Sequence, residues 1–110
     1  MDLYAEKGDP ALLKAQEAMW EDMVYTKMYV TGGVGSRHKD EAFGDSYELP
    51  NDRAYAETCA SIANFMWSWR LLLATGKSRY ADVMELSLYN IIAGSVSSDG
   101  CKFFYSNPLQ

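Results

Sequence analysis

Apolar residues recur at helical spacing in three stretches of the chain, separated by glycine-containing segments. The first stretch follows Asp9 and Pro10, an acid suited to capping a helix and a proline suited to its first position. Its apolar stripe consists of Leu12, Leu13, Met19, Trp20, Met23 and Val24. A stripe with this period is typical of an amphipathic helix, which we predict over about residues 10–28.

The second stretch is the most apolar part of the sequence. One of its stripes repeats at alternating spacings of four and three, and consists of Tyr55, Cys59, Ile62, Met66, Trp69 and Leu73. Asn51 or Asp52 can cap the start of a helix here and Gly76 its end, which predicts a helix over about residues 52–75. A second apolar stripe runs beside the first, and a helix with so wide an apolar surface is enclosed on most sides.

The third stretch begins at Ser78, which is suited to capping, and predicts a helix over about residues 78–93. The short link "TGKS" makes this helix an antiparallel neighbour of the second. The following segment, "SVSSDGCKFFYS", predicts a β-hairpin over about residues 95–106 that turns at Asp99-Gly100. Residues 29–50 carry four glycines and no sustained period, which predicts a long loop, and such loops are often functional.

The composition narrows the class of protein. A chain of 110 residues with 48% hydrophobic residues has the size and apolar content of one folded domain. The net charge of -5, without a basic cluster, argues against nucleic-acid binding. No apolar run approaches the roughly 20 residues of a membrane-spanning helix, so we expect no membrane contact. Three helices and a hairpin cover too little of the second helix, so we expect a larger helical assembly or an oligomer.

Glu57 and Cys59 both lie near the start of the second predicted helix, where a polar residue and a cysteine would be buried. A buried carboxylate is costly unless it is paired, and carboxylate and thiolate are both zinc ligands. Residues two apart in a regular helix point about 200° apart, so one metal takes both only if the first turn is irregular. Spacing alone favours a core cysteine and a glutamate stabilised by the helix N-terminus.

Other polar residues are candidates with ordinary alternatives. Glu41 lies in the glycine-bounded loop and, with Glu57, matches the paired carboxylates of a glycosidase, although two such acids are commonly unrelated. Glu85 borders the apolar face of the third helix, where a solvated glutamate is the alternative. Tyr105 ends the aromatic run "FFY", where core packing is the alternative. "TGGVGS" lacks the ending of a phosphate-binding loop, and the single histidine, His38, cannot form a metal site alone.

Three longer motifs together resemble a known family. They are "YVTGGVGSRHKDEAFGDSYELPNDRAYAETCASIA", "RYADVMELSLYN" and "DGCKFFYSNPL", and they run from Tyr29 to Leu109. They are similar to the bacterial β-L-arabinofuranosidases, a glycoside hydrolase family. The resemblance implies an (α/α)6 helical barrel followed by β-sandwich domains, with this chain as the closing part of the barrel. We therefore expect a mainly α fold with three helices, a long glycine-containing loop and a short C-terminal β-hairpin.

The resemblance also implies roles for five residues. The glutamate of "EAFG", Glu41, is implied to be the catalytic acid/base. The glutamate and cysteine of "AYAETC", Glu57 and Cys59, are implied to be zinc ligands. The glutamate of "YADVMEL", Glu85, and the tyrosine of "FFY", Tyr105, are implied to contact the sugar. Zinc is thus the expected cofactor, and it would pair with the buried carboxylate.

The implied reaction is a retaining double displacement, in which a zinc-held thiolate attacks the anomeric carbon while Glu41 protonates the leaving oxygen. The family's nucleophile belongs to a cysteine pair that this sequence lacks, and Cys101 does not match it. We therefore expect a parent enzyme that cleaves a carbohydrate substrate, and no activity from these 110 residues without the remainder of the enzyme or a second copy. Two alternatives stay open: a different glycoside substrate, or a non-catalytic helical interaction module.

Overall fold

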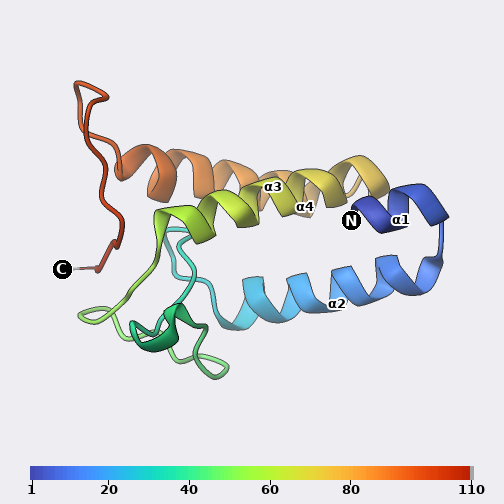
Figure 1. The fold of residues 1–110 in the computed structure, drawn as a ribbon, viewed down its shortest axis with the longest axis horizontal. Helices are drawn as coiled ribbons and strands as arrows, with labels where there is room; N and C mark the ends of the chain where they lie inside the picture. The colour runs from blue at the N-terminus through green and yellow to red at the C-terminus, as the bar shows by residue number, and fades with distance from the viewer. Residues whose placement is uncertain (110) are drawn as a thin grey trace.

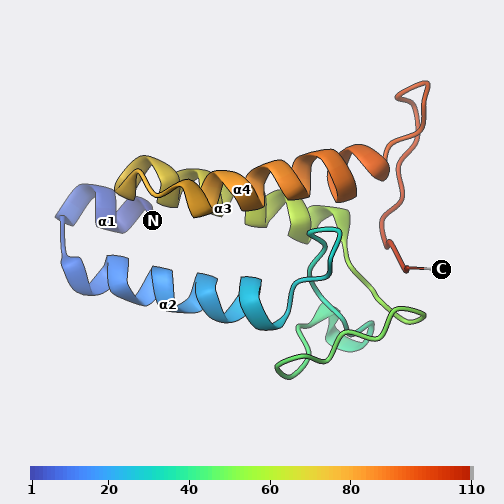
Figure 2. The same cartoon turned by 180° about the vertical axis from the view of Figure 1, so that it is seen from behind.

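The computed structural model describes residues 1–109, which form four α-helices and no named β-strand. The helices are α1 (Asp2–Lys7), α2 (Pro10–Thr26), α3 (Thr58–Thr75) and α4 (Ser78–Leu86), and two shorter segments are the 3-10 turn η1 (Lys39–Glu41) and the π-helical η2 (Ser87–Ile92). Helices α3 and α4 run side by side, and α2 lies along them on one side (Figures 1 and 2). The long loop and the C-terminal segment gather at the same end of the molecule (Figure 1).

Local capping signals account for some of the helix ends, and the predicted mainly α fold is confirmed. The Asp9 carboxylate accepts a hydrogen bond from the Ala11 amide at 2.9 Å, and α2 lies within the predicted range. Gly76 ends α3 in the left-handed conformation, with φ at 68°. The prediction missed α1, a short helix in which no residue is buried. No helix among the described residues is long and apolar enough to cross a membrane.

The predicted start of the second helix is wrong by about two turns. The helix α3 begins at Thr58, because the backbone before it is held by distant parts of the chain. The amide of Ala56 donates to the Gly35 carbonyl, and the amide of Asn107 donates to the Tyr55 carbonyl. These bonds keep residues 54–57 outside the helix, although Asn51 or Asp52 could have capped it.

The predicted β-hairpin over 95–106 is not confirmed. Within the described residues there is one isolated antiparallel bridge here, between Val96 and Phe103, and the chain turns back around Asp99. Pairing stops because the next residues turn to a different partner. Ser106 forms its bridge with Glu57, in the segment that leads into α3. The C-terminal segment is therefore attached to the start of α3.

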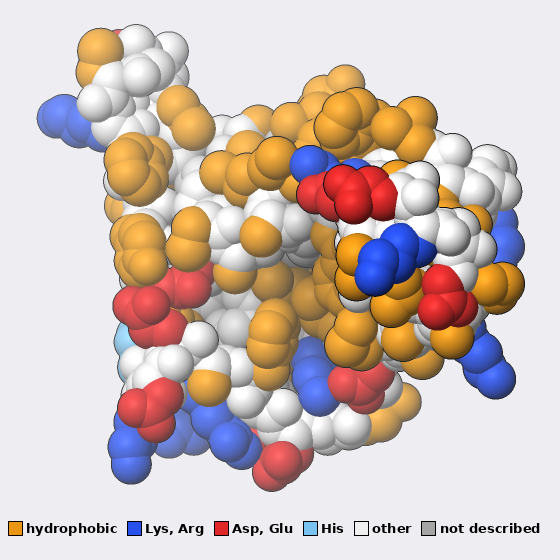
Figure 3. Space-filling model, turned by 45° about the vertical axis from the view of Figure 1, so that its right-hand side comes forward, with side chains coloured by type: hydrophobic (Ala, Val, Ile, Leu, Met, Phe, Trp, Pro, Cys, Tyr) orange, Lys and Arg blue, Asp and Glu red, His pale blue; other side chains and the backbone are white. Residues whose placement is uncertain are grey.

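The helix α3 turns a polar face toward the rest of the chain. Its buried residues are Thr58, Ser61, Asn64, Ser68 and Leu71. Ser68 accepts a hydrogen bond from the Trp20 indole at 2.8 Å, which satisfies the donor of a fully buried side chain. The predicted apolar stripe lies on the open side, with Ile62, Met66, Trp69 and Leu73 between 41% and 69% exposed. Figure 3 shows hydrophobic side chains gathered in the upper part of the molecule, at the level of α3 and α4.

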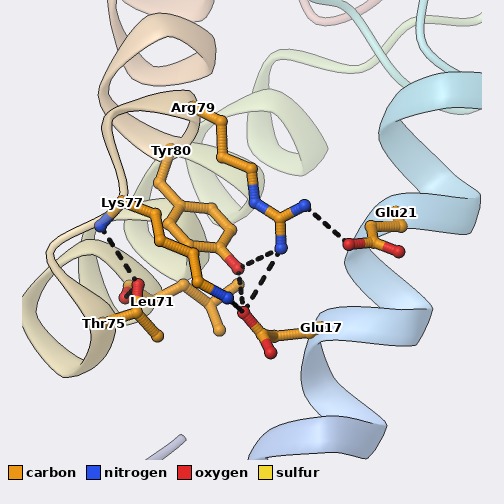
Figure 4. Close-up of polar contacts among 7 residues, drawn as sticks. All are labelled: Glu17, Glu21, Leu71, Thr75, Lys77, Arg79 and Tyr80. Atoms are coloured by element: carbon orange, nitrogen blue, oxygen red, sulfur yellow. Dashed lines mark hydrogen bonds and ion pairs between the residues drawn. The ribbon is translucent and has the colours of Figure 1, made fainter.

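Large side chains and an ion-pair cluster join α2 to α4. Trp20 and Tyr80 are fully buried, and their rings meet edge to face at 4.7 Å between centroids. Beside them lies what we call the interhelix cluster, formed by Glu17, Glu21, Lys77, Arg79 and Tyr80 (Figure 4). These residues fix α2 against the start of α4, far along the helices from the long loop (Figure 1).

Candidate active site

Glu57 and Cys59 converge because Glu57 does not belong to a helical turn. Glu57 is the N-cap of α3 with extended backbone angles, φ at −65° and ψ at 138°. Its side chain therefore need not point away from Cys59, and the Cys59 Sγ lies 3.5 Å from the Glu57 Oε2. The irregular first turn that a shared metal requires is thus present in the structure.

Tyr105 reaches the same place from the C-terminal segment. The Thr58 amide donates to the Tyr105 carbonyl at 2.9 Å, and this bond sets the tyrosine against the start of α3. Its hydroxyl lies 3.8 Å from the Cys59 Sγ. Hydrogen bonding to Glu57, and then to Cys59, raises the pKa of the Tyr105 phenol well above its ordinary value of 10.0. The phenol therefore serves as a neutral hydrogen-bonding group beside the two candidate ligands.

Glu41 joins this site through Tyr55, a residue that sequence reasoning assigned to an apolar stripe. The Tyr55 hydroxyl donates to the Glu41 Oε1 at 3.1 Å, and its ring meets the Tyr105 ring at 6.0 Å between centroids. Desolvation, followed by the hydrogen bond to Glu41, raises the pKa of Tyr55. On its other side, Tyr55 contacts the ring of His38 at 4.5 Å. Because Tyr55 lies before the true start of α3, helical periodicity could not reveal this role.

Glu41, Tyr55, Tyr105, Cys59 and Glu57 thus form a continuous chain of contacts, which we call the polar row. The backbone at Glu41 is constrained, since Asp40 and Glu41 both have positive φ, at 62° and 47°. Such angles are uncommon for residues with a side chain and often accompany functional sites. The polar row gathers four of the five residues that the sequence selected, and adds Tyr55.

Glu85 is the selected residue that the structure places elsewhere. It is exposed on α4 and lines a shallow hollow of about 330 Å³ together with Asp82, Leu86, Tyr89 and Asn90. Among the described residues, none of the contacts of the polar row includes Glu85. Its predicted contact with a sugar stays a prediction.

The Glu57 carboxylate is a candidate metal ligand. Glu57 is only 7% exposed, and within residues 1–109 its Oε1 is buried without a hydrogen-bond partner. Leaving a charged oxygen in this state is costly unless another group supplies a positive charge. Carboxylate oxygen and thiolate sulfur are ordinary zinc donors, so Glu57 and Cys59 fit two positions of a zinc site. The described residues contain no cluster of three such ligands, so the other donors would come from elsewhere.

A groove opens beside these candidate ligands. Its volume is about 460 Å³, and Cys59 and Tyr105 lie on its wall together with Ile62, Ile92 and Phe103. Cys101 also faces this groove and, like Cys59, is exposed and free. The polar row is therefore accessible from the groove at Cys59 and Tyr105.

Comparison with known proteins matches the whole chain to one family. Residues 1–110 match the family model described as β-L-arabinofuranosidase, GH127 catalytic domain. The non-reducing end β-L-arabinofuranosidase of Bifidobacterium longum subsp. longum is 42% identical over 103 residues. This match covers 94% of the present chain and 16% of that protein, so the chain spans about a sixth of its curated relative.

Solved structures give the same result. A crystal structure of a GH127 β-L-arabinofuranosidase from Geobacillus stearothermophilus T6 is 50% identical, with a TM-score of 0.94 over 97% of this chain and 17% of that chain. A second GH127 β-arabinofuranosidase structure is 49% identical, with a TM-score of 0.95 over 98% of this chain and 17% of the other. By sequence and by fold, the chain belongs to the GH127 β-L-arabinofuranosidase family of glycoside hydrolases.

Proposed function

We propose that this chain is part of a retaining, zinc-dependent glycoside hydrolase that cleaves β-L-arabinofuranosides. The observation that carries the proposal is the convergence of Glu57 and Cys59, with one carboxylate oxygen buried and unpaired among the described residues. In this proposal the two residues are zinc ligands, and Tyr105 contacts the sugar beside them. The substrate class is suggested by the names of the relatives, and a relative with a different glycoside substrate is the alternative.

Glu41 is the proposed acid/base. Its carboxyl group is exposed, and Tyr55 donates to one oxygen, so the other oxygen is left to exchange a proton with the substrate. In the first step Glu41 gives a proton to the leaving glycosidic oxygen, and in the second it removes a proton from the attacking water. The hydrogen bond from Tyr55 holds the Glu41 side chain in place for both steps.

Glu57 and Cys59 are the residues of this chain that would hold zinc. When bound, zinc keeps a cysteine ligand in its thiolate form. The resemblance assigns the nucleophile to a cysteine other than Cys59 or Cys101, so we propose that residues 1–110 alone do not turn over substrate. Glu57 orients Cys59 through the contact between their side chains, and Tyr105 keeps that sulfur close to the groove.

The proposal includes the (α/α)6 barrel as the setting of this chain. The support is the exposed apolar stripe of α3, because Ile62, Met66, Trp69 and Leu73 together need a covering partner. The remainder of the parent enzyme is the proposed cover, and a second copy of the chain is the alternative.

Two variants of the full-length protein test the proposed function. Glu41→Gln removes the proton-transfer group, and we expect hydrolysis of an aryl β-L-arabinofuranoside to fall about 10²–10⁴-fold with an unchanged melting temperature. Cys59→Ser is expected to lower the bound zinc, measured by elemental analysis, together with the activity. Glu6→Gln, at an exposed carboxylate of α1, is the matched control for Glu41. Full activity in Glu41→Gln, or zinc-free protein with wild-type turnover, would contradict the proposal.

A further inference from the structure

The Asn107 side chain hydrogen-bonds to the residue before Glu57 through that residue's backbone and to the residue after it through that residue's side chain. The Asn107 amide nitrogen donates to the Ala56 carbonyl at 2.9 Å and to the Thr58 Oγ1 at 3.1 Å. The backbone amide of Asn107 donates to the Tyr55 carbonyl at 3.1 Å. Asn107 therefore spans the residues before and after Glu57, while its own side chain is only half-buried and belongs to a segment 50 positions away.

The backbone that Asn107 holds is strained. Ala56 has a positive φ of 40°, an angle that residues with a side chain rarely adopt. Such an angle persists only where neighbours impose it. The amide of Ala56 donates to the Gly35 carbonyl at 2.6 Å, and its carbonyl receives the Asn107 bond, so both faces of this residue are fixed.

The glycine-containing loop over residues 29–50 packs against Ala56. A side chain at Gly33 would come within 3.1 Å of the Ala56 Cβ, so the loop and the strained residue are in close contact. The bend at Ala56 directs Glu57 inward, where it is buried, and lets α3 begin one residue later. The convergence of Glu57 and Cys59 thus depends on a turn that the local sequence does not favour.

Asn107 also ties this turn to Tyr105. The Thr58 hydroxyl accepts from Asn107 and donates to the Phe104 carbonyl at 2.5 Å. Because Tyr105 lies between Phe104 and Asn107 in the chain, these bonds fix its backbone against the start of α3. Loss of the Asn107 side chain would therefore loosen Glu57 and Tyr105 together.

We propose that Asn107 is the positioning residue of the Glu57–Cys59 pair, and that it sets the metal affinity of the pair without touching the metal. This inference rests on the proposed function, in which Glu57 and Cys59 bind zinc. Groups that orient metal ligands commonly contribute 10–100-fold to metal affinity. Asn107→Ala is therefore expected to weaken zinc binding by about 10–100-fold.

The experiment measures zinc affinity of the full-length protein by competition with a chelator. Asn107→Ala is compared with Asn90→Ala, since the Asn90 amide makes a local hydrogen bond, to the Leu86 carbonyl four residues earlier at 2.9 Å. We expect wild-type affinity in Asn90→Ala. Asn107→Asp, nearly equal in volume but without the donor, is expected to behave as Asn107→Ala does, and replaces it if the alanine variant does not fold.

A second readout separates positioning from general destabilisation. Cobalt replaces zinc in the same variants, and the thiolate-to-cobalt absorption band reports the arrangement around the Cys59 sulfur. We expect this band to shift or weaken in Asn107→Asp at temperatures where circular dichroism shows a folded protein. Wild-type affinity and an unchanged band in a folded Asn107 variant would overturn the inference. Cys59→Ser distinguishes the two possible failures. If Cys59→Ser reduces zinc binding but the Asn107 variants do not, the proposed function stands and only this inference fails. If Cys59→Ser does not reduce zinc binding, the proposed function itself fails.

Discussion

The interhelix cluster and the polar row are both built from carboxylates and tyrosines, but they differ in how completely they are paired. In the interhelix cluster, Glu17 Oε1 accepts from Lys77 at 2.6 Å, from Tyr80 at 2.7 Å and from Arg79 at 3.3 Å (Figure 4). In the polar row, the Glu57 Oε1 is buried without a partner in the described part of the chain. The first carboxylate pairs with two cations, whereas the second forms no ion pair within residues 1–109.

This difference distinguishes a cluster that stabilises the fold from the candidate active site. A carboxylate that is paired in the folded chain contributes to stability, whereas a buried unpaired carboxylate opposes it. The interhelix cluster also lies against the main core, beside Trp20 and Tyr80, while the polar row lies at the end where the long loop and the C-terminal segment meet. Substitutions at the two ends are therefore expected to change different properties.

Trp20→Ala is expected to have the largest effect on stability. The indole is fully buried, and its removal leaves a large cavity and breaks the hydrogen bond to Ser68. Truncations of this kind cost about 3–5 kcal/mol, which urea denaturation followed by circular dichroism would measure. Zinc affinity of the protein that remains folded is expected to stay at the wild-type value. A loss of zinc affinity without a loss of stability would break the proposed separation of the two ends.

The sequence predicted helix ends correctly at Asp9 and at Gly76. Asp9 and Pro10 begin α2, and Gly76 ends α3, each through contacts with neighbouring residues in the sequence. The prediction that Ser78 caps the third helix is wrong, because Ser78 is the first residue of α4 and Lys77 is its N-cap.

Prediction from the sequence also failed at the start of α3, because Ala56 is held by residues far away in the sequence. The apolar stripe of α3 was recognised, but a stripe does not say which partner covers it. In the structure, Ser68 and its polar neighbours face Trp20 instead.

The candidate site was selected by motif resemblance, and its geometry was not accessible from the sequence. Helical spacing predicted that Glu57 and Cys59 diverge, and only the strained turn at Ala56 brings them together. Tyr55 was missed because its role depends on a contact with Glu41, fourteen residues earlier. In each of these cases the position of the side chain depends on hydrogen bonds between residues far apart in the sequence. Hydrophobic periodicity does not reveal such bonds.

Glu17→Gln is expected to have the next largest effect. The substitution keeps the shape of the side chain but weakens three hydrogen bonds, two of them from cations. Hydrogen bonds to charged groups contribute about 1.5–3 kcal/mol, so we expect a loss in that range. Urea denaturation measures it, and Glu6→Gln on α1 should stay within about 0.5 kcal/mol of wild type. Equal effects of the two variants would show that the interhelix cluster adds no stability.

The effect of Glu17→Gln is also expected to depend on pH. The hydrogen bond from Lys77, followed by that from Tyr80, lowers the pKa of Glu17 from its ordinary value of 4.5. A carboxyl group with a depressed pKa in the folded state contributes its full stability above pH 4.5, and loses it as pH falls through the folded-state pKa. The denaturation midpoints of wild type and Glu17→Gln should therefore converge in acid. A constant difference down to pH 2 would contradict the pairing of Glu17 in its charged form.

Glu57→Gln is expected to have the smallest effect on stability. The change in stability should also have the opposite sign to the change caused by Glu17→Gln, which makes this the sharpest comparison. In the presence of a chelator, the substitution removes a buried carboxylate whose Oε1 has no hydrogen-bond partner among residues 1–109, a state that costs about 1–3 kcal/mol. The α3 N-terminus favours the charge by only about 0.3–1 kcal/mol, so desolvation should dominate. We expect the melting temperature in chelator to rise, by an amount equivalent to about 1 kcal/mol. With zinc present the same variant should melt below wild type, since it binds the metal less tightly. A lower melting temperature under both conditions would mean that Glu57 stabilises the fold by itself, as Glu17 does.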